Sequence, residues 1–156
     1  MRGSEMDIII REAQKKEDAN FIAQFQVEMA KETENLDLDP AKTIKGVCHI
    51  FEHPDEGRYW VSLYKGEVIG CLLTLYEWSD WRQGKVLWVH SVFVKKPFRG
   101  QGVFKKLYQN IKEKVENDPG LLGIRLYVDK TNHQAQKVYK ALGMSDEHYS
   151  LFEWMA

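Results

Sequence analysis

The stretch VKKPFRGQGVF, residues 94–104, is the point at which the sequence pattern changes from strand to helix. Gly100 and Gly102 stand directly before the helical pattern, and glycine lets the backbone come close to a ligand. The first amides of a helix have no partner inside the helix, and the helix dipole adds positive potential there. The loop is therefore a candidate site for a phosphate or pyrophosphate. A tight strand-to-helix turn without a ligand is the alternative.

Neither of two common nucleotide-binding motifs matches this loop. The pattern G-x-x-x-x-G-K-[ST] is absent, and Lys105 stands where G-x-G-x-x-G requires its third glycine. The loop also follows a predicted hairpin instead of the first strand of the chain. ATP and NAD therefore fit poorly, and another carrier of pyrophosphate is indicated. Five basic residues add positive charge around the loop: Lys95, Lys96, Arg99, Lys105 and Lys106.

The segments before the loop predict three consecutive strands. Arg58–Tyr64 and Glu67–Tyr76 are apolar and β-branched, and Lys65-Gly66 between them suits a two-residue hairpin turn. After a polar loop at Glu77–Gly84, Lys85–Val94 predicts a third strand. Strict alternation would place these residues on one face of it: Val86, Trp88, His90, Val92 and Val94.

The whole chain predicts an α+β fold with a mixed, mostly antiparallel central sheet flanked by helices. The remaining predicted elements are a strand at Asp7–Arg11, helices at Lys16–Glu34 and from Asp39 to His53, a helix after Gly102, a strand at Leu122–Val128, a helix from Thr131 to Gly143 and a last strand at Ser150–Met155. No repeat, low-complexity tract or linker interrupts the chain, so we expect one domain spanning residues 1–156.

Composition limits the classes of partner. The 156 residues include 22 Lys and Arg against 23 Asp and Glu, a net charge of −1, so a phosphate-neutralising basic surface and nucleic-acid binding are not expected. No apolar run reaches the ~20 residues of a membrane span, and Met1–Asp7 lacks the apolar core of a secretory signal. We therefore expect a cytoplasmic protein without membrane contact. Cys48, Cys71 and the five histidines lack metal-ligand spacing, so no metal is expected.

Two motifs resemble the GNAT superfamily of acyl-CoA-dependent N-acetyltransferases. Arg99-x-x-Gly102-x-Phe104 resembles the family's cofactor loop, R/Q-x-x-G-x-G/A, although Phe104 replaces a small residue. Asn132-x-x-Ala135-x-x-Val138-Tyr139-x-x-x-Gly143-Met144 resembles its second signature. Leu87–Gly102 and the aromatic segment Tyr76–Trp81 are most similar to the diamine (polyamine) acetyltransferase branch. The resemblance implies a GNAT-like acyl-CoA acyltransferase fold with acetyl-CoA as cofactor.

The same resemblance implies a set of cofactor-binding residues. The amides of Gly100–Lys105 would hold the CoA pyrophosphate, the strand edge at Val92–Val94 would pair with pantetheine, and Asn132–Ala135 with Leu142 would complete the thioester end. The full set is Val92, Phe93, Val94, Arg99, Gly100, Gln101, Gly102, Val103, Phe104, Lys105, Asn132, His133, Gln134, Ala135 and Leu142.

Two residues are candidates for proton transfer. Tyr139 occupies the family's proton-donor position, and its phenol, pKa ~10, keeps its proton until charge develops on a thiolate, pKa ~8.5. The alternative is a tyrosine packed in the apolar stripe of a helix. His90 is the favoured general base because the imidazole pKa of ~6.5 lies near neutral pH. A core histidine is its alternative, and Glu77 is the reserve base.

Candidate residues for the acceptor lie on the first helix and after the second strand of the hairpin. Acidic residues crowd the end of the first helix, a field that would attract a cation, and a solvated helix face is the alternative. Glu28, Glu77 and Trp78 are the substrate-binding candidates.

We expect direct acetyl transfer from acetyl-CoA to a primary amine of a small, polyamine-like cation, because the motifs contain no nucleophilic cysteine or Ser-His-Asp set. Alternatives are a CoA-binding sensor without transferase activity and a peptide or protein N-acetyltransferase. Dimers are common in the family, so a homodimer stays open beside a monomer.

Overall fold

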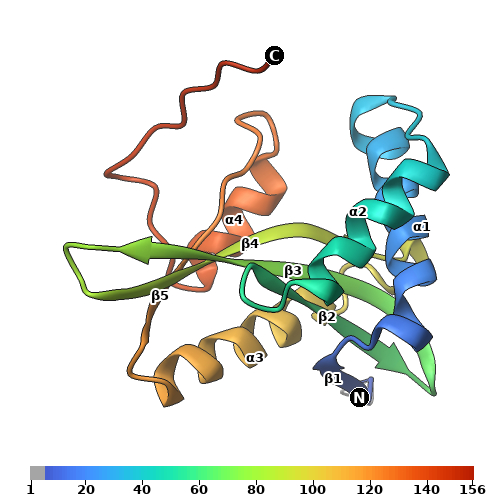
Figure 1. Ribbon diagram of the computed structural model, residues 1–156, viewed down its shortest axis with the longest axis horizontal. Coiled ribbons are helices and arrows are strands. Elements are labelled where there is room, and N and C mark those ends of the chain that lie inside the picture. Colours follow the sequence, from blue (N-terminus) through green and yellow to red (C-terminus); the bar gives the residue numbers. More distant parts are fainter. Residues whose placement is uncertain (1–5) are drawn as a thin grey trace, which may run out of the picture. The chain divides into compact units, whose positions relative to one another are not determined.

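The computed structural model describes residues 6–156, which form two compact units, one ending at Arg125 and the other comprising Leu126–Ala156 (Figure 1). Residues 1–5, which carry most of the expectation about a secretory signal, lie outside the described residues. The first unit contains β1 (Ile8–Glu12), α1 (Lys15–Glu34), α2 (Pro40–Glu52), β2 (Gly57–Tyr64), β3 (Glu67–Ser79), β4 (Gly84–Val94), a 3-10 turn η1 (Lys96–Phe98), α3 (Val103–Asn117) and β5 (Leu121–Arg125). The second contains α4 (His133–Ala141).

The five strands form one sheet in the order β1-β2-β3-β4-β5. The first four are antiparallel to their neighbours, and β5 runs parallel to β4, so the predicted mixed, mostly antiparallel sheet is confirmed. Lys65 and Gly66 both have positive φ, 49° and 77°, as a tight hairpin turn requires, and the predicted β2–β3 hairpin is confirmed.

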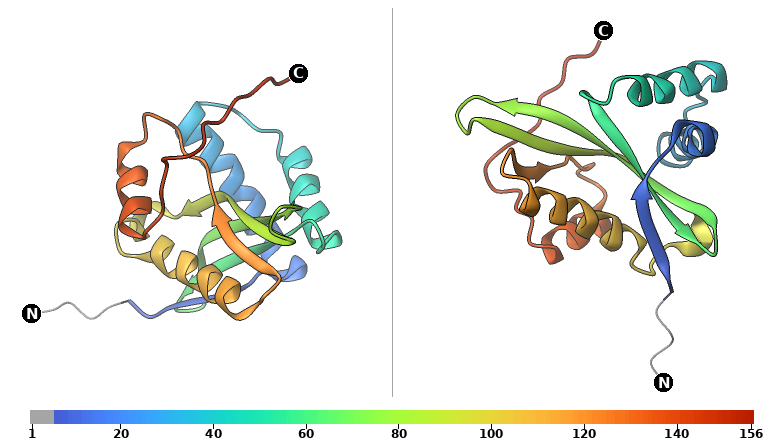
Figure 2. Two further views of the ribbon diagram at one scale, coloured as in Figure 1. Left: turned by 90° about the vertical axis from the view of Figure 1, so that its left-hand side faces the viewer. Right: turned by 60° about the horizontal axis from the view of Figure 1, so that its bottom comes forward.

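Helices cover both faces of the sheet within the first unit. Helices α1 and α2 lie on one face and α3 on the other (Figure 2). Ile22 of α1 and Val47 of α2 pack in one core cluster with Tyr59 and Val61 of β2. The fully buried Leu107 belongs to α3. Both faces of the central strands are therefore apolar, which accounts for their nearly continuous hydrophobic sequence.

A β-bulge corrects the predicted alternation of β4. On β3, Cys71 and Leu73 are two residues apart, but their partners on β4, Phe93 and His90, are three apart. Ser91 adopts a positive φ of 51° at this point. The extra residue turns Phe93 to the face of His90, so the expectation that Val92 and Val94 share that face is wrong.

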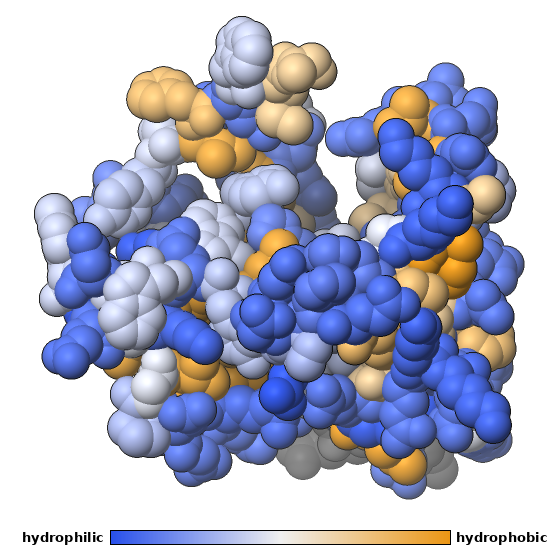
Figure 3. Space-filling view, viewed as in Figure 1, coloured by the Kyte–Doolittle hydropathy of each residue, from blue (hydrophilic) through white to orange (hydrophobic). Residues whose placement is uncertain are grey.

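The structure also moves the ends of several predicted elements. Strand β3 continues to Ser79 and β4 begins at Gly84, so the predicted loop at Glu77–Gly84 is shorter and Glu77 lies on a strand. The predicted strand at Ser150–Met155 is wrong: these residues form no ladder with any described strand. A run rich in apolar residues cannot by itself make a strand, because a strand needs a partner edge. Large side chains of this C-terminal segment are exposed (Figure 3): Leu151, Phe152, Trp154 and Met155.

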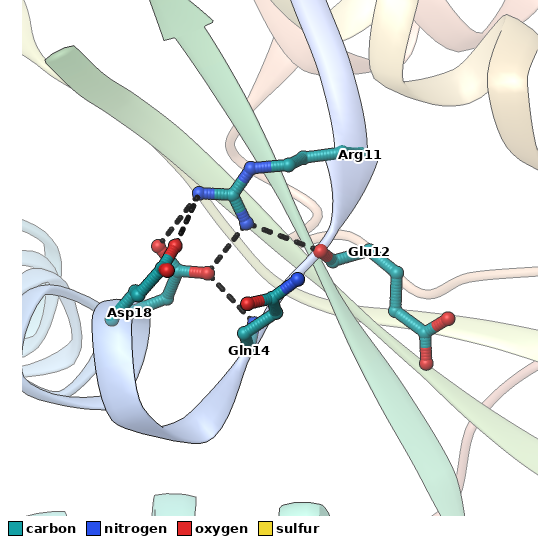
Figure 4. A network of polar contacts seen from close by, with 5 residues as sticks. Arg11, Glu12, Gln14 and Asp18 are labelled. Carbon is teal, nitrogen blue, oxygen red and sulfur yellow. Dashed lines mark hydrogen bonds and ion pairs between the residues drawn. The ribbon is translucent and has the colours of Figure 1, made fainter. Parts of the chain in front are cut away.

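An ion pair joins β1 to the start of α1 (Figure 4). The Asp18 side chain is 1% exposed, and Arg11 donates to both of its oxygens, from Nη1 at 2.6 Å and from Nη2 at 3.1 Å. The amide of Gln14, the residue before α1, donates to Asp18 Oδ2 at 2.7 Å. Three hydrogen bonds therefore replace the hydration that the buried carboxylate has lost, and one of them satisfies a backbone amide at the start of α1.

We predict that Asp18→Ala lowers the free energy of unfolding by about 3 kcal/mol, because it leaves a guanidinium and an amide without their acceptor. Glu17→Ala is the matched control: Glu17 is 63% exposed, lies 3.9 Å from Arg11, and should change stability by less than about 0.5 kcal/mol. Urea denaturation measures both values. Equal stability of the two variants would contradict this role of Asp18.

Candidate functional site

The glycine loop joins the end of β4 to the start of α3. Gly100 and Gly102 have φ of 72° and 80°, and Gly102 is the N-cap of α3 without a side-chain cap. A Cβ at either glycine would meet no atom within 4 Å, so these positions need glycine for its backbone conformation and not for space. The first helical hydrogen bond runs from Lys106 N to Gly102 O at 3.1 Å. The amides that precede it belong to the loop and the first turn.

The charge of this helix start favours an anion. The first turn of α3 has no acidic residue, and Lys105 and Lys106 lie there instead, where the helix dipole disfavours cations. A bound phosphate would offset both the positive end of the dipole and the lysine charges. The half-buried Phe104 contacts the Tyr108 ring, 6.2 Å away between centroids and one helical turn further on.

Beyond Trp88, one edge of β4 has no described strand paired with it, and Val94 O on β4 accepts from Arg99 Nε at 2.7 Å. Strand β5 pairs with β4 only from Lys85 to Trp88. Among the strands of residues 6–156, none pairs with the same edge from Val89 to Val94. Free peptide groups on a strand edge can bind an extended ligand by main-chain hydrogen bonds. The predicted pantetheine-binding segment Val92–Val94 lies on this edge.

His90 lies directly before the bulge. Its side chain is half-buried, and its ring stacks with that of Trp88 at 6.1 Å between centroids. Burial lowers the pKa of His90 because desolvation disfavours the imidazolium. At neutral pH the neutral imidazole therefore predominates, which is the form that a general base requires.

Glu77 belongs to a polar cluster that the sequence did not indicate. Glu77 Oε2 accepts from Trp88 Nε1 at 2.8 Å, and Oε1 accepts from Arg125 Nη1 at 2.9 Å. These residues come from β3, β4 and β5, and the strand register places them side by side. A guanidinium already balances this carboxylate, which disfavours Glu77 as a base or as a site for a cationic substrate. The signal available in the sequence was a charged residue, Arg125, in the middle of the predicted strand Leu122–Val128.

The other substrate candidates occupy separate parts of the first unit. Glu28 is exposed on α1, where Gln24 Nε2 lies 3.4 Å from its Oε1. Trp78 is 61% exposed and pairs with Lys85. Lys85 and Val94 are nine positions apart, so Trp78 lies ~30 Å along the strand from the glycine loop. The structure therefore does not bring Trp78 to the loop.

The second unit contains the other predicted residues. Asn132 Oδ1 accepts from Ala135 N at 3.1 Å and caps α4, with His133 and Gln134 in the first turn. Burial raises the pKa of Tyr139, so its phenol keeps its proton at neutral pH. Leu142 N donates to Val138 O at 3.1 Å at the end of the helix.

Cys71 is unsuited to act as a nucleophile. Cys71 is fully buried, and burial raises the pKa of its thiol to about 12. Cys48 is partly buried on α2. Within residues 6–156, no group of three or more His, Cys, Asp or Glu side chains could hold a metal ion, and no helix is long and apolar enough to span a bilayer.

A groove of about 460 Å³ lies between the C-terminal half of α3 and the sheet. Trp60, Tyr76 and Asn110 are among its lining residues. None of the predicted site residues lines it, so its position does not match the predicted cofactor site.

Comparison with known proteins places this chain within one family. The model of the acetyltransferase (GNAT) family matches residues 17–144. Thialysine N-epsilon-acetyltransferase of Bos taurus is 35% identical over 79 residues, which are 51% of this chain and 45% of that protein. The chain thus spans about half the length of the curated relatives it matches.

Solved structures extend the likeness to nearly the whole chain. The crystal structure of a possible acetyltransferase from Clostridium difficile 630 is 38% identical, covers 96% of this chain and 97% of that one, and has a TM-score of 0.88. An integron cassette protein from the mobile metagenome of Cole Harbour Salt Marsh shares 20% identity, with a TM-score of 0.81 and coverage of 94% and 89%. That second likeness is one of fold alone.

We predict that Gly102→Ala lowers the free energy of unfolding by about 1 kcal/mol, because an L-residue there must adopt positive φ. Gly46→Ala is the matched control: Gly46 is exposed within α2, has open space around its Cβ position, and should gain up to about 1 kcal/mol. Chemical denaturation of both variants checks the opposite signs. A stabilised Gly102→Ala would contradict the backbone requirement.

Proposed function

Because the chain belongs to the GNAT acetyltransferase family, we propose that it transfers an acetyl group from acetyl-CoA to a primary amine of a small cationic acceptor. The observation that carries this proposal is the uncapped helix start at Gly102, where loop amides and lysines favour a pyrophosphate. The edge of β4 directly before it has no described strand paired with it, which supports the binding of the extended pantetheine arm.

The first unit carries the residues proposed for the pyrophosphate and the pantetheine arm. The amides of Gly100–Lys105 would hold the pyrophosphate, and Val92–Val94 would pair with pantetheine. The start of α4, Asn132–Ala135, and Leu142 at its end would bind the thioester end. When bound, acetyl-CoA supplies an activated acetyl group as a thioester.

The reaction needs a proton acceptor and a proton donor. An alkylamine with a pKa of ~10.4 is almost fully protonated at pH 7, ~3.4 pH units below its pKa. Deprotonating it at pH 7 therefore costs about 4.6 kcal/mol, at 1.36 kcal/mol per unit. His90 would accept the proton of the amine, directly or through water. The amine nitrogen forms the new C–N bond as the C–S bond breaks, and Tyr139 would protonate the leaving sulfur. No covalent acyl-enzyme is required.

The acceptor class is proposed from the relatives and from the first helix. The name of the bovine relative, thialysine N-epsilon-acetyltransferase, supports an amine acceptor. Glu28, exposed on α1, is the acidic side chain proposed to attract a cation.

An amine panel with detection of released CoA thiol tests the function. We expect steady thiol release with polyamines or with small amino acids that have a side-chain amine, and none without an acceptor. Turnover with peptides alone would indicate a peptide or protein acetyltransferase. CoA binding without turnover across the panel would indicate a sensor, for which Phe104 in the cofactor loop would be the first residue to examine.

For Tyr139→Phe we predict a kcat lower by about ten- to a thousandfold with unchanged affinity for CoA, because packing remains and the acid is lost. Tyr149→Phe, which removes a hydroxyl from a 77% exposed side chain, is the control and should keep the original kcat. Steady-state kinetics and calorimetry with CoA provide the two readouts. An unchanged kcat for Tyr139→Phe would remove this residue from the mechanism.

The pH profile should report the ionisation of His90. Burial lowers the pKa of His90, so kcat/KM should rise with pH through a value below the ordinary ~6.5, as the imidazole loses its proton. His90→Ala should remove that limb, whereas His148→Ala, at an exposed position, should preserve it. Identical profiles for the wild type and His90→Ala would assign His90 to packing alone.

A further inference from the structure

The side chain of Arg99 is held on three sides. Its Nε donates to Val94 O at 2.7 Å, and its Nη1 and Nη2 donate to the two carboxylate oxygens of Glu32 at 2.5 and 2.8 Å. The guanidinium carbon also lies 5.5 Å from the centroid of the Phe93 ring. One side chain thus connects the end of β4, the glycine loop and α1.

The contact with Glu32 has the geometry of a specific link. Two parallel N–H···O bonds between a guanidinium and a carboxylate fix orientation as well as distance. The hydrogen bonds from Arg99 lower the pKa of Glu32, and Glu32 in turn raises the pKa of Arg99. Both groups are therefore fully charged at neutral pH. Their side chains are 38% and 37% exposed, so the pair is accessible to a ligand at the loop.

These contacts change the expected role of Arg99. The sequence motif places Arg99 among the residues that bind the cofactor. In the structure, Nε and both terminal nitrogens already have acceptors, and the carboxylate of Glu32 would repel a diphosphate brought to the same guanidinium. Arg99 is thus better suited to hold the loop than to contact phosphate.

We propose that Glu32 is a positioning residue for acetyl-CoA, which acts through Arg99 to fix the loop Gly100–Lys105 so that its amides face the pyrophosphate. The inference rests on the proposed function of that loop. It also gives the acidic end of α1 a role other than attracting the acceptor. Glu28, one helical turn before Glu32, adds a further negative charge near Arg99, and Lys96 adds a positive charge near Glu32.

Other acidic residues near the end of α1 have separate partners. Asp37 pairs with Lys31 at 3.1 Å, and Asp39 caps α2 by accepting from Ala41 N at 3.0 Å. Glu67 of β3 pairs with Lys95 at the start of the loop at 2.8 Å, and among the described acidic residues of α1 it is Glu32 whose ion pair reaches the loop. The ion-paired link between α1 and Arg99 therefore depends on Glu32.

The test compares CoA affinity in Glu32→Gln and wild-type protein by calorimetry. Loss of the charged bidentate contact should weaken CoA binding and raise the KM for acetyl-CoA by about tenfold. The kcat at saturating acetyl-CoA and the KM for the amine should stay within about twofold of the wild-type values, because the position of the loop affects the binding of the cofactor and not the chemical step. Glu32→Asp, which keeps the charge, should recover part of the affinity.

Two further variants separate positioning from direct contact. Arg99→Lys keeps a positive charge near the loop but cannot form the bidentate contact, so it should weaken CoA binding as Glu32→Gln does. The exchanged pair Glu32→Arg with Arg99→Glu should bind CoA better than either single variant. Glu34→Gln removes the same charge from an exposed position on α1 and should leave affinity unchanged.

Each outcome decides the proposal. Tighter CoA binding by Glu32→Gln would show that Arg99 contacts phosphate once it is released, and it would overturn the positioning role. Unchanged affinity in Glu32→Gln, with normal binding by the wild type, would overturn this inference alone. Wild-type protein that binds neither CoA nor acetyl-CoA would overturn the proposed function and this inference with it. Thermal unfolding of each variant verifies that the fold is retained.

Discussion

One extra residue in β4, opposite β3, is the constraint on which the candidate site depends. A strand paired at one edge can accommodate an extra residue only by a bulge, and Ser91 adopts positive φ to form it. The bulge turns Phe93 into the core, where it stacks on Phe25 of α1 at 4.9 Å between ring centroids. His90 stays half-buried just before this point. The bulge therefore sets the directions of the candidate base and of the strand that leads into the glycine loop.

The core beneath α1 and the glycine loop are parts of one arrangement. The ring of Phe93 stacks on Phe25 of α1 in the core. The guanidinium of Arg99 lies over the same Phe93 ring and also pairs with Glu32 of α1. The position of α1 is set in turn by the buried pair of Arg11 and Asp18 at its start. A series of contacts thus runs from the start of α1 to Arg99 beside the glycine loop.

The environments of the two proton-transfer candidates shift their pKa values in opposite directions. Burial lowers the pKa of His90 and raises that of Tyr139, because in each case it disfavours the charged form. At neutral pH the imidazole of His90 is in the neutral form that accepts a proton, and the phenol of Tyr139 keeps the proton that it would donate. Acetyl transfer to an amine would need both groups, a base to take the proton of the amine and an acid to protonate the leaving thiolate.

The sequence by itself determined the features that depend on neighbouring residues. Helical and strand periodicity predicted the main elements, and Lys65-Gly66 and Gly100 to Gly102 marked backbone positions that require positive φ, because these signals are local. Only the tertiary structure decided the bulge at Ser91 and the extent of pairing along β4. It also decided the hydrogen bond of Arg99 to Glu32, 67 residues away, and that of Arg125 to Glu77, 48 residues away. Such contacts join two distant segments, and the local pattern of either segment does not predict the other. For the same reason, the strand predicted at Ser150–Met155 has no described partner, since pairing is a property of two segments and not of one.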